Sequence, residues 1–263
     1  MSEVLKISRQ LIYYKPKDKK EPVELENQVI KVFEESRNIY GSRKIKIKLE
    51  KAGLLVSLRK IREIMKKYSL ESVYTKRRYK NKATGVNNSE IPNLLERQFN
   101  NRKPMEVLIS DLTYVRVLSR WCYVCLIIDI SNREIIGHSC GEHKDAELVE
   151  RALFSIKSDM DEVDIFHIDR GREFDNCLID EVLEKHNIRR SLSRKGNPYD
   201  NAVAEATYRI FKTEFCQRRS FESLEVLEIE LFDYINWYNN IRIHGALNYL
   251  TPVEYKALYF KTV

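Results

Sequence analysis

Three acidic residues, Asp111, Asp169 and Glu205, are the side chains best suited to chemistry in this sequence. Asp111 lies inside the apolar run 105–117, and Asp169 directly follows the apolar run 163–168. A carboxylate in a buried strand is costly to ionise unless a cation or a metal ion compensates its charge. If these two strands are neighbours, the carboxylates approach each other and need a divalent cation between them. The pair therefore predicts a metal site that a third acid completes.

Glu205 is the candidate for the third acid. Turn-forming residues interrupt the chain at 196–198, and Glu205 falls just after the first turn of a helix predicted over 201–215. Arg209 and Lys212 follow at the spacing that places them on the same helix face. An acid near a helix start also has a plain explanation, because it interacts favourably with the helix dipole.

Other possible ligands have simpler interpretations. Asp129 ends another apolar strand and is interpreted as structural, whereas Glu173 is interpreted as part of a solvated helix start. His167 is interpreted as a packing or supporting residue. Cys122 and Cys125 lie three residues apart in a predicted strand and so point to opposite faces, and no second pair follows to complete a zinc site.

The elements that would position the acids are strands and helices after Pro104. Three β-rich runs come first, over residues 105–117, 120–130 and 133–141, and the short turns between them indicate an antiparallel meander. Alternating helices and strands then follow, over residues 144–159, 163–168, 176–187, 189–193, 201–215 and 220–244. This order predicts an α/β domain with a mixed sheet.

The first part of the chain is strongly basic. Residues 1–104 contain 26 Lys and Arg against 12 Asp and Glu, whereas residues 105–263 contain 20 against 27. This asymmetry indicates a module that binds a polyanion, and a solvated lysine-rich surface is the plain alternative. Amphipathic segments over 22–41, 42–53 and 57–70 predict three helices compatible with a helix-turn-helix. The third opens at Ser57 as N-cap and exposes Arg59, Arg62 and Lys66.

The segment 74–104 is interpreted as a basic linker, because its hydrophobic periodicity is weak and turn residues are frequent. Its cations suit a nucleic-acid backbone, and a flexible hinge is an equally good interpretation. The predicted contacts in this segment are Lys76, Arg77 and Arg78.

Taken together, the motifs resemble the D,D-35-E transposases and retroviral integrases, and specifically the orfB-type transposases of bacterial insertion sequences. The resembling stretches are DLTYV at Asp111, HIDRGREF at Asp169, SRKGNPYDNAVAEATYRIFKTE at Glu205 and YNNIRIHGALNYLTPVEY near the C-terminus. The acids are separated by 57 and then 35 residues. YGSRKI at Tyr40 is similar to the upstream helix-turn-helix segment of the family.

This resemblance implies a ribonuclease-H-like catalytic core over 105–220, with a mixed five-stranded sheet flanked by helices. An all-helical module over 1–73 and the linker would precede it, and a helical extension over 221–263 would follow. By the same resemblance Asp111, Asp169 and Glu205 are catalytic acids that bind Mg²⁺ or Mn²⁺, as two ions, for DNA cleavage and strand transfer. The expected DNA contacts in the core are Arg194, Lys195, Asn201, Arg209 and Lys212.

The implied partners are DNA, as element terminal repeats and target, other copies of the chain on that DNA, and an upstream-frame helix-turn-helix and leucine-zipper protein. A membrane-spanning run and a secretory signal are both absent from the sequence, so we expect a cytoplasmic, nucleoid-associated bacterial protein. Two alternatives stay open. One is a ribonuclease-H-like nuclease that cleaves without joining, and the other is a catalytically impaired or partner-dependent DNA-binding subunit.

Overall fold

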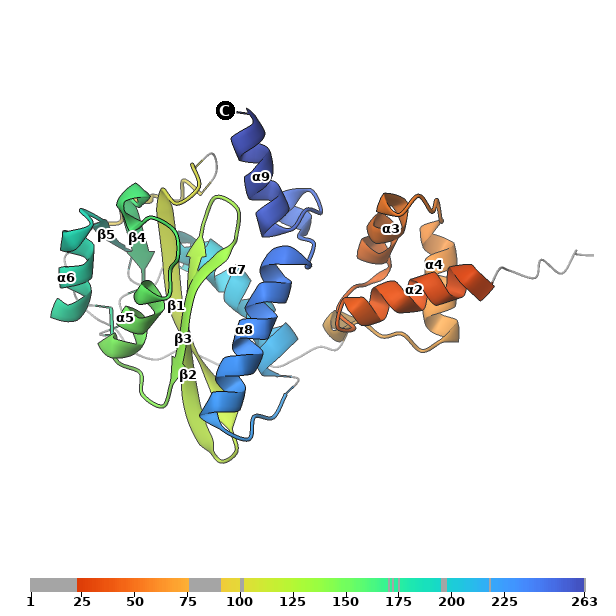
Figure 1. Ribbon diagram of the computed structural model, residues 1–263, viewed down its shortest axis with the longest axis horizontal. Coiled ribbons are helices and arrows are strands. Elements are labelled where there is room, and N and C mark those ends of the chain that lie inside the picture. The colour runs from red at the N-terminus through yellow and green to blue at the C-terminus, as the bar shows by residue number, and fades with distance from the viewer. Residues whose placement is uncertain are drawn as a thin grey trace, which may run out of the picture. The chain divides into compact units, whose positions relative to one another are not determined.

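The computed structural model describes residues 23–75, 91–99, 102–169, 171, 173–174, 176–194, 198–217 and 219–262. The chain divides into two compact units, Met1–Glu71 and Ser72–Val263. Figure 1 shows the helices of the first unit and the sheet of the second. Among the described residues, no helix combines the length and the apolar character needed to cross a lipid bilayer.

The first unit contains three helices, α2 (Val23–Glu35), α3 (Ser42–Lys51) and α4 (Leu58–Lys67). The chain turns after α3 at Gly53, whose positive φ of 83° is accessible to glycine at little cost. Ser57 caps α4 as expected, because its side chain accepts a hydrogen bond from the Lys60 amide. Apolar side chains from all three helices form the core, namely Val29, Phe33, Ile45, Leu49, Ile61 and Ile64. The three predicted helices are therefore confirmed.

The second unit is built on a mixed five-stranded sheet in the order β3-β2-β1-β4-β5. The strands are β1 (Val107–Val117), β2 (Arg120–Asp129), β3 (Ile135–Gly141), β4 (Ile165–Ile168) and β5 (Arg189–Leu192). The first three pair antiparallel, whereas β4 pairs parallel with both β1 and β5. This arrangement confirms the predicted mixed sheet and makes the strands that carry or precede the two aspartates direct neighbours.

Helices cover both faces of the sheet (Figure 1). On one face α5 (Ala146–Phe154) and α6 (Cys177–Lys185) bury an apolar cluster against alternate residues of the strands, including Leu108, Ile127 and Phe166. On the other face lie α7 (Ala202–Phe211), which contacts β1, and α8 (Leu224–Asn240), which contacts β3. Because strand side chains alternate between faces, Asp111 belongs to the α7 face.

Two helix boundaries differ from the sequence prediction. The helix predicted over 201–215 begins as α7 and continues as a π-helix, Lys212–Cys216. The helix predicted over 220–244 is shorter, because α8 ends at Asn240. A further helix, α9 (Pro252–Thr262), falls within the predicted helical extension 221–263 but was not predicted as a separate element. Its start carries a capping box, in which Thr251 Oγ1 accepts from the Glu254 amide and Glu254 Oε2 accepts from the Thr251 amide.

A short segment of the chain runs along the outer side of β5. The Leu192 amide donates to the Pro92 carbonyl at 3.2 Å, and the Leu94 amide donates to Ser191 Oγ at 2.9 Å. Further along this segment Arg97 forms an ion pair with the buried Asp200 at 2.8 Å. The residues just before the sheet domain are thus fastened to its edge and to the turn that precedes α7.

Candidate active site

Asp111 and Asp169 lie next to each other across two parallel strands. Val107 pairs with Ile165 and Ile109 with His167, so the same register continued by two residues places Asp111 opposite Asp169. Asp111 sits within β1, where its carboxylate accepts a hydrogen bond from the Leu112 amide at 2.7 Å. The expectation that β1 and β4 are neighbours is confirmed.

The two carboxylates oppose each other's ionisation. Burial, together with the negative charge of Asp169, raises the pKa of Asp111 to about 7. Burial and the charge of Glu173 likewise raise the pKa of Asp169. The cations of Lys212 and Lys144 act in the opposite direction on Asp111. The pair is therefore a partly desolvated, negatively charged oxygen site that a bound cation would stabilise.

Lys144 and Glu173 form an ion pair beside the aspartates. Their charged groups are 2.8 Å apart, and the Glu173 side chain is buried. This burial corrects the interpretation of Glu173 as part of a solvated helix start. A Cβ at position 171 would meet the Glu173 carboxylate, so a larger residue there would require the Glu173 side chain to move. Glu173 thus lies close enough to Asp169 for its negative charge to act on that carboxyl group.

Glu205 lies in the first turn of α7 and is exposed to solvent. In the part of the chain that the structure describes, no three acidic, histidine or cysteine side chains lie close enough to share one metal ion. The structure therefore brings Asp111 and Asp169 together but does not place Glu205 with them.

His167 supports the site from within the core. Its ring contacts Ser191 Oγ at 2.8 Å, Ser193 Oγ at 3.1 Å and the Asp200 carbonyl at 3.1 Å. Burial lowers the pKa of His167 to about 4, so the ring is neutral at physiological pH. These contacts tie β4 to β5 and to the 3-10 turn Pro198–Asn201 before α7. They are consistent with the packing role inferred from the sequence.

Tyr208 is a residue that the sequence interpretation missed. It lies one helical turn beyond Glu205, and its buried hydroxyl donates to the Asp111 carbonyl and accepts from the Leu126 amide. Asp111 and Leu126 are paired across β1 and β2, so the hydroxyl bridges these strands at the level of the aspartate. The sequence signal that could have identified Tyr208 is its position on the buried face of the helix that carries Glu205.

The family of this chain follows from its matches to known proteins. Residues 101–198 and 205–259 match two families that are both described as integrase core domain, and residues 20–78 match an HTH-like domain. The chain is 30% identical to the protein InsK of insertion sequence element IS150 from Escherichia coli K12, over 95% of this chain and 90% of that protein. The chain belongs to the insertion-sequence transposases.

Further proteins and a solved structure are also similar to this chain. The transposase of insertion sequence element IS904 from Lactococcus lactis is 29% identical, over 88% of this transposase and 93% of that protein. The 31 kDa protein of insertion element IS600 from Shigella sonnei is 30% identical, over 98% of each chain. Among solved structures, the HTLV-2 integrase catalytic core domain in complex with magnesium is similar at 14% identity and a TM-score of 0.45, over 59% of this chain and 97% of that one.

An integrase core implies a divalent metal ion, and the chemistry of this site fits one. Carboxylate oxygens are the ligands that hard divalent cations prefer. Asp111 and Asp169 are two such groups, held side by side in partly desolvated positions where each disfavours the charge of the other. Asp111 and Asp169 are therefore oxygen donors of a kind that would suit such an ion at the junction of β1 and β4.

The predicted DNA contacts of the core differ in their accessibility. Arg209 is exposed on the same side of α7 as Glu205. Arg194 is also exposed, and its guanidinium lies 3.6 Å from Glu96. Lys212 is half-buried, with its ammonium 5.8 Å from the centre of the Tyr114 ring. Arg209 and Arg194 are therefore both accessible from solvent, although Arg194 would have to exchange its contact with Glu96 for a phosphate.

Asn201, a further predicted DNA contact, is 7% exposed, and its side-chain oxygen has no hydrogen-bond partner within the described residues. A direct contact of Asn201 with DNA would require the start of α7 to open. Lys195, the remaining predicted contact of the core, lies outside the described residues.

The helical unit of the transposase exposes its predicted contacts. Arg59, Arg62 and Lys66 all lie on the solvent side of α4. Arg59 also pairs with Glu63 on the same helix at 3.0 Å, which offsets part of its charge. The predicted linker contacts Lys76, Arg77 and Arg78 lie outside the described residues.

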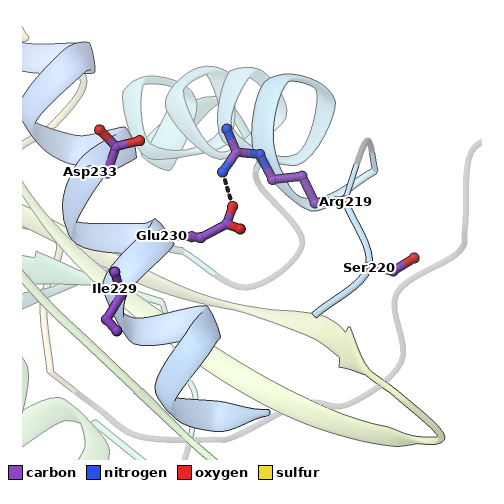
Figure 2. A pocket seen from close by; sticks show the side chains of 5 residues that line it. All are labelled: Arg219, Ser220, Ile229, Glu230 and Asp233. Carbon is purple, nitrogen blue, oxygen red and sulfur yellow. Dashed lines mark hydrogen bonds and ion pairs between the residues drawn. The ribbon is translucent and has the colours of Figure 1, made fainter. Parts of the chain in front are cut away.

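A surface hollow of the transposase lies beside α8, and none of the predicted site residues that the structure describes lines it. Figure 2 shows its lining, formed by Arg219, Ser220, Ile229, Glu230 and Asp233. An ion pair between Arg219 and Glu230 spans it (Figure 2). None of these five side chains is among the predicted catalytic acids, so this hollow is not a candidate for the chemical step.

Proposed function

We propose that this transposase cleaves DNA at the ends of its element and joins the freed strand to a target, using Asp111, Asp169 and Glu205 as its catalytic acids. The observation that carries the proposal is the adjacency of Asp111 and Asp169, two carboxylates whose pKa values are raised by burial and whose charges oppose each other. Structural carboxylates are normally paired with cations instead, and perturbed acids of this kind cluster at functional sites. Family membership supplies the reaction class.

The cleavage step is a hydrolysis. The oxygen of a water molecule attacks a phosphorus atom at the element end and forms a new P–O bond. The bond from that phosphorus to the 3′-oxygen of the element strand breaks, and the 3′-oxygen takes a proton to become a hydroxyl. The flanking strand keeps a 5′-phosphate. The water proton lost from the nucleophile passes to solvent.

The joining step uses the same site with a different nucleophile. The freed 3′-hydroxyl attacks a phosphorus atom in the target, a phosphodiester forms, and a target 3′-hydroxyl leaves. One phosphodiester replaces another, so no nucleotide cofactor is needed. Two Mg²⁺ or Mn²⁺ ions, when bound by the acids, would activate the attacking oxygen and stabilise the leaving one.

Glu205 is proposed to complete this site when DNA and metal are present. It lies at the start of α7, and α7 packs against β1, the strand that carries Asp111. Its exposure leaves the carboxylate available to a ligand that approaches from solvent. A shift of the first turn of α7 toward the two aspartates would bring in the third acid.

The DNA would be held by cations of both units. Arg209 and Arg194 are proposed to contact phosphates near the reacting strand, because both are exposed and Arg209 lies one helical turn after Glu205 on α7. Arg62 and Lys66 on α4 are proposed to bind the terminal repeat. We further infer that copies of the chain assemble on DNA in the bacterial cytoplasm at the nucleoid, with an upstream-frame helix-turn-helix and leucine-zipper protein as an additional partner.

A strand-transfer assay tests the proposal. Labelled element-end DNA is incubated with Mg²⁺ and either the wild-type chain or the Glu205→Gln variant, and DNA binding is measured in parallel. We expect nicked and joined products from the wild type only, with DNA binding largely unchanged in the variant. Cleavage without joining would instead identify a nuclease. Full activity of Glu205→Gln would show that the triad is misassigned.

A further inference from the structure

A buried ion pair between Glu214 and Arg242 ties the end of the Glu205 helix to the C-terminal part of the chain. Glu214 lies in the π-helix Lys212–Cys216, which continues α7 without interruption, and Arg242 follows the end of α8. Arg242 Nε donates to the carboxylate at 2.8 Å and 3.1 Å, and Nη2 donates at 2.7 Å. The two residues are only 4% and 3% exposed.

Other side chains complete the surroundings of this carboxylate. The hydroxyls of Tyr234 and Tyr74 both donate to Glu214, the first at 3.1 Å. Arg242 also contacts the ring of His244, with Nη1 3.1 Å from Nδ1. We name these five residues the Glu214 cluster. Both carboxylate oxygens accept several hydrogen bonds, so a rotation of the π-helix would break charge-assisted bonds inside the protein.

Such a pair is better suited to fixing a geometry than to adding stability. The cost of desolvating both charges offsets much of their attraction, and apolar pairs of similar volume often stabilise a fold equally well. A buried ion pair nevertheless accepts only one relative orientation of its two groups. π-helices are also found frequently at functional sites. In this chain, Glu214 of the buried ion pair lies within the π-helix itself.

The Glu214 cluster is connected to Glu205 through continuous helix. Glu214 lies nine positions after Glu205 along α7 and the π-helix, which corresponds to about 14 Å at the rise of an α-helix. A change in the axial rotation of this segment would move Glu205 sideways relative to Asp111 and Asp169. Catalytic and metal-binding geometry tolerates little displacement, because an error of about 1 Å can strongly lower the rate.

We propose that Glu214 and Arg242 are positioning residues, which set the axial rotation of α7 and thereby the place of the Glu205 carboxylate. The proposal rests on the assigned role of Glu205. Tyr74 and Tyr234 also donate to the acceptor oxygens of Glu214, so three side chains from two distant parts of the chain, around residue 74 and at the end of α8, hold this one carboxylate. None of these side chains needs to touch DNA for this role.

The decisive variant replaces both charges with apolar groups of similar size, Glu214→Leu together with Arg242→Met. Removing both partners avoids leaving one charge buried alone, so the fold is expected to survive with an unchanged denaturation midpoint. In the metal-free protein, we expect the amides of α7 to exchange hydrogen at least fivefold faster, while those of α5 stay as in the wild type. In the cleavage assay, we expect the Mg²⁺ concentration for half-maximal rate to rise about tenfold.

A matched control is available in the ion pair shown in Figure 2. Arg219 follows the π-helix and Glu230 lies on α8, so this pair joins neighbouring segments of the chain, but its side chains are 30% and 38% exposed. The double variant Arg219→Met, Glu230→Leu should therefore leave both hydrogen exchange in α7 and the Mg²⁺ dependence at wild-type values. A similar loss in both double variants would overturn the positioning role, because any disturbance near α8 would then suffice.

The conservative variant Arg242→Lys decides the question if the apolar pair does not fold. Lysine keeps the positive charge but cannot make the two-pronged contact with Glu214. We expect faster exchange in α7 and a rise of about threefold in the half-maximal Mg²⁺ concentration. Wild-type behaviour in both measurements, in Arg242→Lys or in the folded apolar double variant, would overturn the proposal.

Failure of the catalytic assignment would look different. If the wild type does not cleave, or if Glu205→Gln cleaves normally, the assigned role of Glu205 is wrong whatever Arg242 does. Hydrogen exchange in the metal-free protein still reports whether the Glu214 cluster holds α7. Unchanged exchange with an active wild type and an inactive Glu205→Gln variant would reject the positioning role alone.

Discussion

Burial, together with the carboxylate of Asp169 across the parallel junction of β1 and β4, raises the pKa of Asp111. This relationship means that the acids of the site oppose folding when no cation is bound. A group whose pKa is higher in the folded state than in the unfolded state favours folding at low pH. That contribution is lost as the pH rises through the folded pKa, here from about 4 to about 7.

Asp111→Asn is therefore expected to stabilise the metal-free protein at pH 8. The gain should be on the order of 2 kcal/mol or less, because one pKa unit corresponds to about 1.4 kcal/mol and solvent screens part of the effect. The gain should disappear near pH 4, where the wild-type carboxyl is protonated. Urea denaturation in the presence of a chelator measures both values. If the stability gain of Asp111→Asn over the wild type is no larger at pH 8 than at pH 4, the electrostatic explanation is wrong.

Adding Mg²⁺ should reverse that ranking. A ligand that binds only the folded state stabilises it in proportion to the logarithm of its concentration above Kd. The wild-type melting temperature should rise with Mg²⁺, whereas those of Asp111→Asn and Asp169→Asn should stay nearly constant. Glu147→Gln, at the first turn of α5, provides a control that should respond like the wild type. Equal shifts in all four proteins would mean that the ion binds elsewhere.

Tyr208→Phe should affect both stability and catalysis. The substitution removes the hydroxyl that accepts from the Leu126 amide and donates to the Asp111 carbonyl. Leaving these buried groups without a partner costs about 1–3 kcal/mol. Because the same bond aligns Asp111, strand cleavage should slow more than the lost stability explains at temperatures where both proteins are folded. Tyr114 is an exposed tyrosine on β1, the strand that carries Asp111. The control variant Tyr114→Phe should therefore change the free energy of unfolding by less than about 0.5 kcal/mol.

Arg62→Ala and Lys66→Ala should each weaken binding of the terminal repeat without changing the fold. Both side chains are exposed on α4. If each neutralises one phosphate, the slope of log K against log salt should fall by about 1 per variant. Fluorescence anisotropy over a salt series measures this slope. Lys31→Ala, an exposed residue of α2, should keep the wild-type slope, and an equal drop there would indicate diffuse attraction instead of a defined interface.

Much of the sheet could be predicted because its signals are local. Each strand is a short apolar run bounded by turn residues, and the order of strands and helices favours one mixed arrangement. The nearness of Asp111 and Asp169 then follows from register, since each acid lies two residues beyond a paired position. What the pattern could not supply is the distance from Glu205 to this pair, which depends on how α7 packs.

Other features depended on contacts between distant residues. Glu173 lies in a polar stretch that indicates solvent exposure, and its burial is compensated by Lys144, which belongs to another segment. In the π-helix, Glu214 pairs with Arg242, which lies 28 residues further along the chain. In contrast, α9 had a local signal that was overlooked, because Thr251 and Glu254 form a capping box around Pro252.

The segment that lies along β5 has a consequence for assembly. A free edge strand is a template to which another chain can add a strand of its own. At β5 that template is occupied by Pro92 and Leu94, and a proline there has no amide with which to extend the ladder. A second copy of this transposase therefore cannot pair a strand of its own with β5 at this position while Pro92 and Leu94 stay in place.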